Sequence, residues 1–305
     1  MTTSTYTITS RLFYAGLWCC ALPLYVLYLM YRSVAQPEYR KHIPERLGLY
    51  KKTLHAPLWL HAASLGEVKA AAPLLAELRL AHPELAILIS CQTPAGRNAG
   101  QALLLENSLC VYLPFDISIF TQRFLRVFKP RIALIFETEI WPNLFLSTRQ
   151  AGIPLMMINA RITERSVRRY AKFSTLVSQA LKLPDVIVCQ TQADAERYIQ
   201  AGALPSAVSV SGNIKWDIGV EQQAKREALY QRHPVWVAAS THEDEQQIIF
   251  QMHRKLVQQW PEALLLWAPR HPERFTPAYN QALEAGFRIQ RRSQIDLPYS
   301  NDQIF

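Results

Sequence analysis

The feature that most constrains this chain of 305 residues is an uncharged stretch near its start, from Leu12 to Tyr31. A helix of that length, at about 1.5 Å per residue, spans the hydrocarbon core of a bilayer. Tyr14, Trp18, Tyr28 and Tyr31 lie toward its ends, as is typical of membrane interfaces. Pro23 in its middle is compatible with a kinked crossing or with insertion into one leaflet. We therefore predict a membrane anchor over residues 1–35.

Basic residues are unevenly distributed around this stretch. Arg11 precedes it, whereas Arg32, Arg40, Lys41 and Arg46 follow it. By the positive-inside bias, this asymmetry predicts that the remainder of the chain faces the cytoplasm. The net charge of +9 also favours an anionic partner, which is nucleic acid, an acidic membrane or a phosphorylated substrate. A buried helix of a soluble domain is the alternative interpretation of the stretch.

Beyond the anchor, short apolar runs alternate with segments of helical spacing. The runs that we predict as strands are Pro57–Ser64, Leu85–Thr93, Cys110–Asp116, Arg131–Glu139, Ile153–Arg161, Asp185–Thr191 and Ala207–Asn213. Between the first two, apolar residues of Gly66–Pro83 recur at the spacing of one helix face. Strands that alternate with helices predict βαβ units, a parallel sheet and an α/β fold.

A polar segment, Asp217–His233, separates this pattern from a second one of the same type. We predict one Rossmann-like domain over residues 36–220 and a second domain over residues 221–305. Two α/β units in tandem place the loops at the carboxyl ends of their strands on either side of a cleft. Ligand chemistry is expected there.

The second domain is expected to contain a helix from about His242 to Gln259. Its strands are predicted at Val235–Ser240, Ala263–Arg270 and Phe287–Gln290. Thr241, with Asp244 three residues later, suits a capping box at the start of the helix. Three strands make a thin sheet, so we expect this domain to be incomplete.

Absent motifs exclude several chemistries. The chain has no G-x-G-x-x-G fingerprint, no P-loop, no H-E-x-x-H and no G-x-S-x-G elbow. Its five cysteines include no C-x-x-C pair, which argues against a disulfide scaffold or a zinc module. The hydrophobic content of 50% excludes disorder as the dominant state.

Carboxylates follow two of the predicted strands. Glu67 lies just after a strand, at the start of a helix whose positive dipole end favours an ionised carboxylate. Such a group suits a base that takes a proton from an alcohol, and the alternative is that it only caps the helix. Glu137 and Glu139 follow another apolar strand, where acidic residues are costly unless they are hydrogen-bonded or functional.

Basic residues gather at three further places. The stretch Arg161–Lys172 indicates either a cationic helix face for phosphate groups or a solvated surface. Its candidate phosphate ligands are Arg161, Arg165 and Arg168. Lys215, after a strand, suits the neutralisation of developing negative charge. Arg270 and His271 lie at a strand end of the second domain, where a nucleotide phosphate would fit.

A series of short motifs in this order carries a family resemblance. The motifs are HAASLGEV, TPAG, YLPFD, FETEIWPN, INARIT, GNIKWD, ASTHEDE and PRHPERF. Together they closely resemble the 3-deoxy-D-manno-octulosonic acid (Kdo) transferases of Gram-negative lipopolysaccharide synthesis. The match runs from Tyr39 to about Phe275. The predicted anchor fits as well, because family members carry an N-terminal membrane segment and work at the cytoplasmic face of the inner membrane.

The resemblance implies an inverting, metal-independent GT-B glycosyltransferase with two Rossmann-like domains facing a cleft. Its donor would be CMP-Kdo and its acceptor a phosphorylated lipid A precursor, with no further cofactor and no nucleic acid partner. Glu67 matches the general base of the family. Glu137 and Lys215 match positions that stabilise the transition state, and Pro269 and Arg270 match part of the CMP-binding surface.

The chain departs from the family pattern at its C-terminal end. The resemblance implies that members continue past Phe305 with an acidic strand-loop and a glycine-rich segment that hold the nucleotide, and neither occurs here. We therefore expect a truncated member that is itself inactive. Two alternatives are a membrane-tethered module that binds acidic lipid without catalysis, and a GT-B transferase that uses a UDP-sugar.

Overall fold

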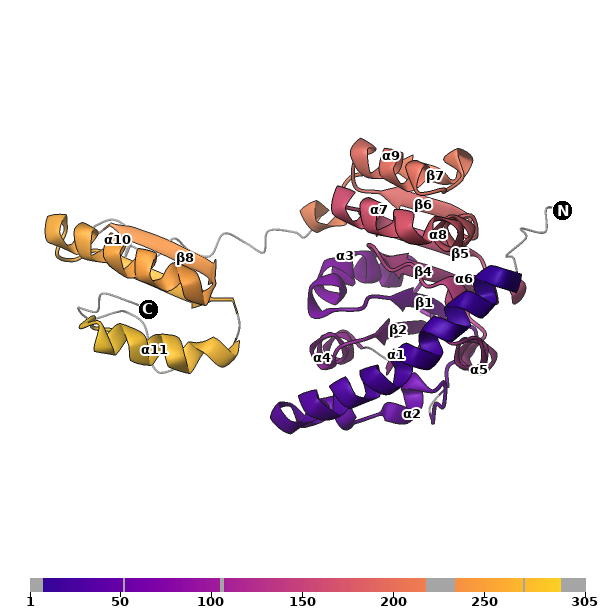
Figure 1. Ribbon diagram of the computed structural model, residues 1–305, viewed down its shortest axis with the longest axis horizontal. Coiled ribbons are helices and arrows are strands. Elements are labelled where there is room, and N and C mark those ends of the chain that lie inside the picture. Colours follow the sequence, from indigo (N-terminus) through magenta and orange to yellow (C-terminus); the bar gives the residue numbers. More distant parts are fainter. Residues whose placement is uncertain (1–7, 52, 105–106, 218–233, 271, 292–305) are drawn as a thin grey trace. The chain divides into compact units, whose positions relative to one another are not determined.

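The chain divides into two compact units, Met1–Gly219 and Val220–Phe305. The computed structural model describes residues 8–51, 53–104, 107–217, 234–270 and 272–291. Each unit combines a parallel sheet with helices (Figure 1). The larger, N-terminal unit contains most of the predicted site residues.

The first unit is built on a seven-stranded sheet in which all neighbouring strands are parallel. In spatial order its strands are β3 (Ser108–Tyr112), β2 (Ile87–Cys91), β1 (Leu58–His61), β4 (Ile132–Phe136), β5 (Leu155–Ala160), β6 (Val186–Cys189) and β7 (Val208–Val210). All seven strands predicted for this unit are confirmed. The order changes direction between β1 and β4, and open α/β sheets bind ligands beyond the carboxyl ends of strands at such a switch point.

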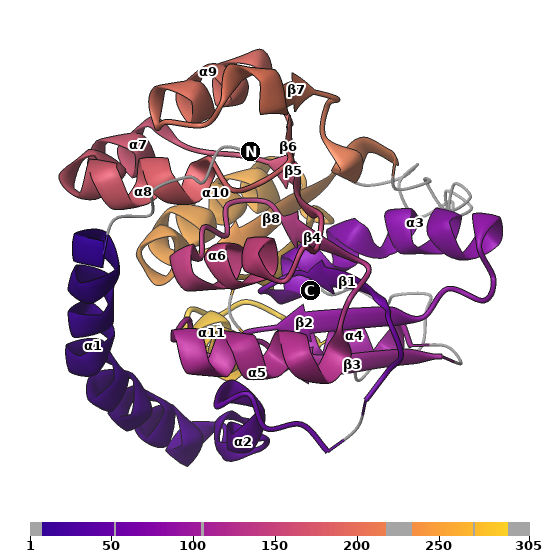
Figure 2. The same ribbon diagram turned by 90° about the vertical axis from the view of Figure 1, so that its right-hand side faces the viewer.

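Helices cover both faces of this sheet (Figure 2). They are α2 (Ile43–Arg46), α3 (Leu65–Ala81), α4 (Pro94–Ala102), α5 (Ser118–Phe128), α6 (Pro142–Gln150), α7 (Glu164–Tyr170), α8 (Ser174–Leu181) and α9 (Gln192–Gln200). Residues of β1 alternate between two cores: Trp59 packs with Phe124 of α5, whereas Leu60 packs with Val68 of α3. Because both faces are covered, the strands read as near-continuous apolar runs.

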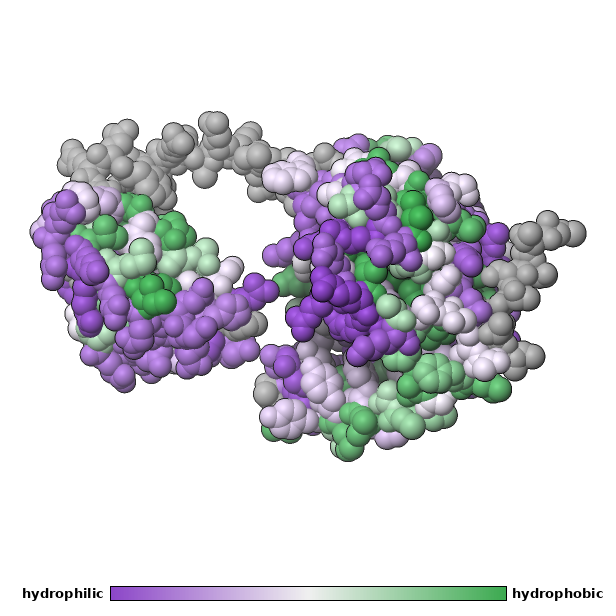
Figure 3. Space-filling model, turned by 45° about the horizontal axis from the view of Figure 1, so that its top comes forward, coloured by the Kyte–Doolittle hydropathy of each residue, from purple (hydrophilic) through white to green (hydrophobic). Residues whose placement is uncertain are grey.

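The helix α1 (Ile8–Ala35) contains the uncharged stretch and continues through Pro23. Its segment Thr9–Val34 is long and apolar enough to cross a membrane, and only 6% of the most apolar window is buried. Leu24 and Val34 are 68% and 85% exposed. The predicted apolar N-terminal helix is confirmed, and it is not a buried core helix. Hydrophobic side chains also gather at the lower edge of the first unit in the view of Figure 3.

One buried carboxylate joins α1 to the sheet domain. Asp116, which follows β3, is 2% exposed. Its carboxylate accepts hydrogen bonds from the Tyr14 hydroxyl of α1 at 2.9 Å and from the backbone N–H groups of Asn143 and Leu144 at 3.0 and 2.7 Å. The two amides belong to the first turn of α6, so Asp116 caps that helix and fastens α1 beside it.

The second unit is a smaller α/β layer. Its elements are β8 (Val235–Thr241), α10 (Gln246–Gln259), β9 (Leu264–Pro269) and α11 (Phe275–Glu284). The two strands are parallel, and Ala238, Phe250, Leu265 and Phe287 pack between them and the helices. The predicted third strand at Phe287–Gln290 is wrong for the described part of this unit, which has only a single bridge residue there. Phe287 is buried against the helices, so its apolar character serves the core rather than a sheet.

The start of the second unit's first helix also differs from the prediction. The capping box is formed by His242 and Glu245, whose carboxylate accepts the His242 N–H at 2.7 Å, and a 3₁₀ turn precedes α10. Thr241 is still part of β8, and its hydroxyl accepts a hydrogen bond from the Trp267 indole at 2.9 Å. The predicted box of Thr241 and Asp244 is therefore wrong by one residue, because the strand extends one residue further.

Candidate active site

Glu67 lies in the first turn of α3, directly beyond β1. Ser64 is the N-cap of the helix, and its hydroxyl oxygen accepts the Glu67 N–H at 3.4 Å. The Glu67 carboxylate in turn accepts the Ala63 N–H at 2.8 Å and the Ser64 hydroxyl at 3.0 Å. Helix capping, the alternative role considered for Glu67, is thus present. It also fixes the orientation of a carboxylate that stays partly exposed.

The helix α4 approaches this turn closely because it carries glycine at position 96. A Cβ atom there would lie 3.1 Å from the Ser64 carbonyl carbon and 3.2 Å from the Ala63 oxygen. The same oxygen accepts backbone N–H groups of Gln92 and Thr93 at 3.0 and 3.3 Å. The TPAG motif therefore packs against, and stabilises, the backbone that holds Glu67.

Glu139 lies in the turn after β4, and its side chain lies next to that of His61 at the end of β1. The Trp141 indole donates to Glu139 Oε2 at 2.8 Å, and His61 Nε2 lies 3.7 Å from the same oxygen. His61 is fully buried, with Nδ1 3.0 Å from the Ser90 carbonyl oxygen. The same Nδ1 lies 2.9 Å from the Ser90 hydroxyl oxygen, so Nε2 is the ring nitrogen that faces Glu139.

The surroundings shift the pKa values of Glu67 and Glu139 in opposite directions. Burial raises the pKa of Glu67 above its ordinary value, the Ala63 N–H works against this, and the charge of Glu139 adds to it. For Glu139, burial also disfavours the charged form, but His61 and Trp141 outweigh burial and lower its pKa. Pairs of carboxyl groups with pKa values pushed apart are typical of acid–base sites.

Glu137 and Lys215 are brought together. Lys215 Nζ lies 2.8 Å from Glu137 Oε1. Glu137 directly follows β4 and has a φ of 59°, uncommon for a residue with a Cβ atom. The 3₁₀ turn η4 (Ile214–Asp217), which carries Lys215, is held by buried Asn159 of β5, whose Oδ1 accepts the Ile214 N–H at 3.1 Å.

The predicted arginine face is less regular than its spacing suggested. Thr163 caps α7, so the helix begins at Glu164 and Arg161 lies before it. Arg161 nevertheless adjoins the Glu137–Glu139 turn, because its carbonyl oxygen accepts the Thr138 hydroxyl. Arg165 and Arg168 are exposed on α7, and Arg168 pairs with Glu164 at 3.1 Å. The helix therefore carries Arg165 and Arg168, whereas Arg161 lies on the segment before it.

Pro269 and Arg270 lie at the carboxyl end of β9 in the second unit. A cavity of about 180 Å³ is lined there by Pro269, Thr241, His242 and other residues. The Arg270 N–H donates to the Thr241 carbonyl oxygen at 3.0 Å, which ties the ends of β8 and β9 together, and the Arg270 side chain is exposed. His271 lies outside the described residues.

Within the described ranges, no group of three or more His, Cys, Asp and Glu side chains could hold a metal ion. Cys91 and Cys110 are buried with their sulfur atoms 3.9 Å apart. The hydrogen bond between them and burial both raise the pKa of the Cys91 thiol, which keeps it protonated and unreactive. Glu67, Glu137, Glu139, His61 and Lys215 are thus ionisable groups that lie at the carboxyl edge of the first sheet.

His61 and Asn159 belong to this site and are not among the predicted site residues. His61 is the last residue of an apolar strand and, like the core residues before it, is buried. Asn159 is the residue before the last one of β5, and its φ of 51° and its contact with Ile214 are set by neighbouring chain segments. The parallel pairing of β1 with β4 and of β4 with β5 brings both residues to the edge that carries the glutamates.

Comparison with known sequences gives one consistent family. Residues 41–218 match the family model described as 3-deoxy-D-manno-octulosonic-acid transferase (kdotransferase). The chain is 34% identical over 303 residues to the 3-deoxy-D-manno-octulosonic acid transferase of Haemophilus influenzae, which covers 96% of this chain and 71% of that protein. It is 35% identical over 258 residues to the Bordetella pertussis protein of the same name, covering 79% of this chain and 58% of that protein.

Solved structures share the fold at much lower identity. The UDP-N-acetylglucosamine 2-epimerase of Rickettsia bellii has a TM-score of 0.51 at 11% identity, covering 83% of this chain and 68% of that one. The UDP complex of Staphylococcus aureus MnaA has a TM-score of 0.50 at 15% identity, with the same coverage of 83% and 68%. These likenesses show the fold alone, and the predicted α/β fold of the GT-B class is confirmed.

Proposed function

Because the chain belongs to the family of 3-deoxy-D-manno-octulosonic acid transferases, which are glycosyltransferases, we propose that it transfers Kdo from CMP-Kdo to a phosphorylated lipid A precursor. The observation that carries the proposal is the Glu67 carboxylate. It is held by two hydrogen-bond donors, remains partly exposed and lies beside the switch point of the sheet. Its raised pKa suits a proton acceptor that works near neutral pH.

In the proposed step, Glu67 takes the proton of an acceptor hydroxyl while the hydroxyl oxygen bonds to the anomeric carbon of Kdo. The bond between that carbon and the phosphate oxygen of CMP breaks, and CMP leaves with the electron pair. A single displacement of this kind inverts the anomeric configuration. The fixed orientation of Glu67 supports it, because a positioned base avoids the entropic cost of an encounter.

Glu139 and His61 act on Glu67 through charge. His61 keeps Glu139 ionised, and the negative charge of Glu139 raises the pKa of Glu67 more than the charge of His61 lowers it. A base with a pKa closer to the working pH gives a larger driving force for proton transfer while staying ionised. We assign Glu139 and His61 as positioning residues and Glu67 as the catalytic base.

Lys215 and Glu137 form the proposed electrostatic element. A lysine ammonium group near the leaving phosphate would stabilise the charge that develops as the glycosidic bond breaks. The ion pair of 2.8 Å with Glu137 restricts the position of that ammonium group. Pro269 and Arg270, beside the cavity at the end of β9, are assigned to CMP.

The acceptor and the membrane are assigned from charge and hydropathy. Arg161, Arg165 and Arg168 are exposed and suit the phosphate groups of a lipid A precursor. The exposed apolar surface of α1 supports membrane association. The excess of basic residues after α1 over those before it supports the cytoplasmic face of the inner membrane.

The test compares Glu67→Gln with Glu77→Gln, an exposed glutamate further along α3. Transfer of labelled Kdo from CMP-Kdo to a lipid A precursor is measured in membranes. Because the chain by itself is expected to be inactive, the variants are compared in a fusion that adds the parts of the Haemophilus relative outside its matched 71%. Loss of the base is expected to slow transfer by about 10²–10⁴-fold, while Glu77→Gln leaves the rate unchanged.

Three results would contradict the proposal. Equal transfer rates in the Glu67→Gln and Glu77→Gln variants would remove Glu67 from its role as base. Inhibition of the parent protein by UDP but not by CMP would exclude CMP-Kdo as donor. Vesicle binding that is sensitive to salt, without transfer by either form of the protein, would favour the non-catalytic lipid-binding module.

A further inference from the structure

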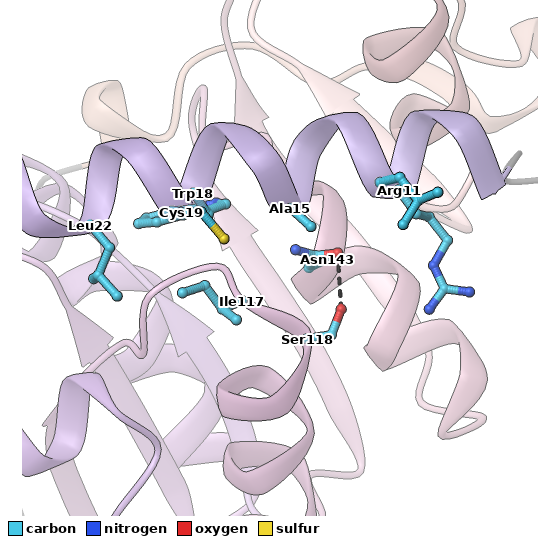
Figure 4. A pocket seen from close by; sticks show the side chains of 9 residues that line it. Arg11, Ala15, Trp18, Cys19, Leu22, Ile117, Ser118 and Asn143 are labelled. Carbon is cyan, nitrogen blue, oxygen red and sulfur yellow. Dashed lines mark hydrogen bonds between the residues drawn. The ribbon is translucent and has the colours of Figure 1, made fainter.

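A cavity lies between α1 and the segment that joins β3 to α5 (Figure 4). Its volume is about 360 Å³, within the range of about 300–1,000 Å³ that is typical of small-ligand sites. Its walls include Arg11, Ala15, Trp18 and Leu22 from α1, and Ile117 and Asn143 from the sheet domain. The ligand chemistry proposed above makes no use of this cavity.

The helix α1 is fastened at both ends of the cavity. Toward its N-terminal end, the Tyr14 hydroxyl donates to Asp116 at 2.9 Å. Toward its C-terminal end, the Tyr25 ring meets the edge of the Phe115 ring with centroids 5.5 Å apart. Both Phe115 and Asp116 belong to the segment after β3. They hold the helix near the next residue, Ile117, and the cavity remains between Ile117 and the helix. The cavity is therefore a built feature of the first unit.

The chemistry of the walls favours an apolar guest. The two polar side chains from the sheet domain already bond within the protein: the Ser118 hydroxyl donates to Asn143 Oδ1 at 3.1 Å, and Asn143 Nδ2 donates to the Asp116 carbonyl oxygen at 2.6 Å. The remaining walls are mainly hydrocarbon, from residues such as Ala15 and Ile117. Such walls favour apolar molecules, which restore the missing dispersion contacts.

Arg11 adds a charge at one end of this apolar space. Figure 4 shows its guanidinium group at one end of the cavity and Leu22 at the other. Arg11 is exposed, so an anion bound there would stay in contact with water. A ligand that matches the cavity therefore has a hydrocarbon chain joined to an anionic group, and guanidinium groups bind phosphate through paired hydrogen bonds.

The surroundings of the cavity indicate where such a ligand comes from. Residues of α1 that do not line the cavity, such as Leu24 at 68% exposure, present hydrocarbon outward. Between Tyr14 and Tyr25 the helix lies alongside the sheet domain, as a helix does when it lies in a membrane interface rather than across the bilayer. A cavity on such a helix opens next to the acyl chains of the leaflet.

We infer that this cavity binds one acyl chain of a membrane phospholipid, with the lipid phosphate at Arg11. The bound lipid would fill the gap between α1 and the sheet domain and so complete the contact between the protein and the membrane. The site involves neither Glu67 nor the sugar donor. Its existence can therefore be tested separately from Kdo transfer.

The test uses the full chain in vesicles of phosphatidylglycerol and phosphatidylcholine that contain no lipid A precursor. A trace of phosphatidylglycerol with a diazirine on one acyl chain is cross-linked by light, and the labelled peptides are identified by mass spectrometry. Labelling is expected to concentrate on Ala15–Leu22 and on Ile117. Ala15→Phe fills the cavity and is expected to reduce this labelling about tenfold, because the ring occupies the volume of several methylenes.

Ala21→Phe is the matched control, since Ala21 is exposed on the same helix and does not line the cavity. It is expected to leave the labelling of Ile117 unchanged. Arg11→Gln is expected to lower the labelling by phosphatidylglycerol more than that by a phosphatidylcholine carrying the same diazirine. Thermal unfolding of each variant checks that the first unit is intact.

Three results would overturn the inference. The first is labelling of the parent protein spread along the exposed face of α1 with no preference for Ile117, a measurement that needs no variant. The second is equal labelling in Ala15→Phe and Ala21→Phe. The third is labelling of Ile117 that occurs only after a lipid A precursor is added, which would assign the cavity to the acceptor instead.

Discussion

Two carboxylates of the first unit, Asp116 and Glu67, share a raised pKa but differ in their access to solvent. Asp116 is 2% exposed and accepts hydrogen bonds from α1 and from the first turn of α6. Glu67 caps α3 through local donors and stays partly exposed. Burial is the largest cause of the raised pKa in both cases. A raised pKa therefore does not by itself distinguish a structural carboxylate from a reactive one.

The origin of the hydrogen-bond donors separates the two. Those of Asp116 come from elements far apart in the sequence, since Tyr14 lies 102 residues away. Removing Asp116 would leave buried donors without acceptors in several elements at once. Those of Glu67 come from its own turn, so its loss affects one helix end only. We therefore expect Asp116 to determine stability and Glu67 to determine activity.

The largest expected effect is on transfer activity. In the fusion with the Haemophilus relative, Glu67→Gln should lower the rate by about 10²–10⁴-fold, because no other group at this turn can accept the proton. Asp116→Asn, measured at a temperature where the variant is folded, should change the rate by less than about tenfold, since Asp116 touches neither sugar. A larger loss of transfer rate in Asp116→Asn than in Glu67→Gln would show that Asp116, and not Glu67, determines activity.

The next effect is on the free energy of unfolding. Asp116→Ala should destabilise the first unit by about 3–5 kcal/mol, because the Tyr14 hydroxyl and two α6 amides lose a buried acceptor. Glu67→Ala should cost about 0.5–2 kcal/mol, as expected for a capping interaction. Denaturant unfolding in detergent measures both, and equal losses would show that the two carboxylates do not differ in structural role.

The titration of Asp116 should determine how the stability of the first unit depends on pH. Burial raises its pKa to about 6 from an ordinary value of 3.8, so the folded state holds this proton more tightly than the unfolded state. The stability that protonated Asp116 contributes is fully present below its ordinary pKa of 3.8. It is lost as the pH rises through about 6. Relative to Asp116→Asn, the parent protein should lose about 3 kcal/mol of unfolding free energy between pH 3.5 and 7. A constant difference between the two proteins would contradict this assignment.

The smallest effect is on the pH dependence of transfer. Activity should rise with pH as Glu67 ionises, and the midpoint should lie above the ordinary pKa of a glutamate, because burial raises the pKa of Glu67. Glu139→Gln removes a charge that contributes to this shift, so the midpoint should move to lower pH by less than about one unit. An unchanged midpoint, measured beside the control Glu77→Gln, would show that Glu139 does not act on Glu67.

The sequence patterns predicted the elements well where local spacing decides the structure. All seven strands of the first sheet follow from apolar runs, because both faces of a parallel sheet are covered. The pattern failed at Phe287–Gln290, where an apolar segment packs on helices instead of extending the sheet. It also failed at Thr241, since the end of β8 is set by pairing with β9 and not by the capping residues themselves.

The candidate site was predicted only in part for a related reason. Glu67 has a local signal, a carboxylate at a strand-to-helix turn, and its motif carries the family resemblance. The contact of Lys215 with Glu137 depends on Asn159, which holds η4 on β5, and no local pattern indicates it. Asp116 and Tyr14 are separated by 102 residues, so their hydrogen bond cannot be read from either neighbourhood.

The attachment of α1 along the first unit has a consequence for how such a protein meets its acceptor. Tyr14 and Tyr25 fix the helix to the segment after β3, whose carboxyl edge is also the edge that carries Glu67. In the proposed membrane-bound state, the height of that edge above the lipid is set by packing instead of by the length of a flexible linker. We expect such an arrangement to select acceptors by the distance of their hydroxyl group from the membrane. A hydroxyl that lies too deep among the headgroups, or too far out on a long sugar chain, would not reach the proposed base Glu67.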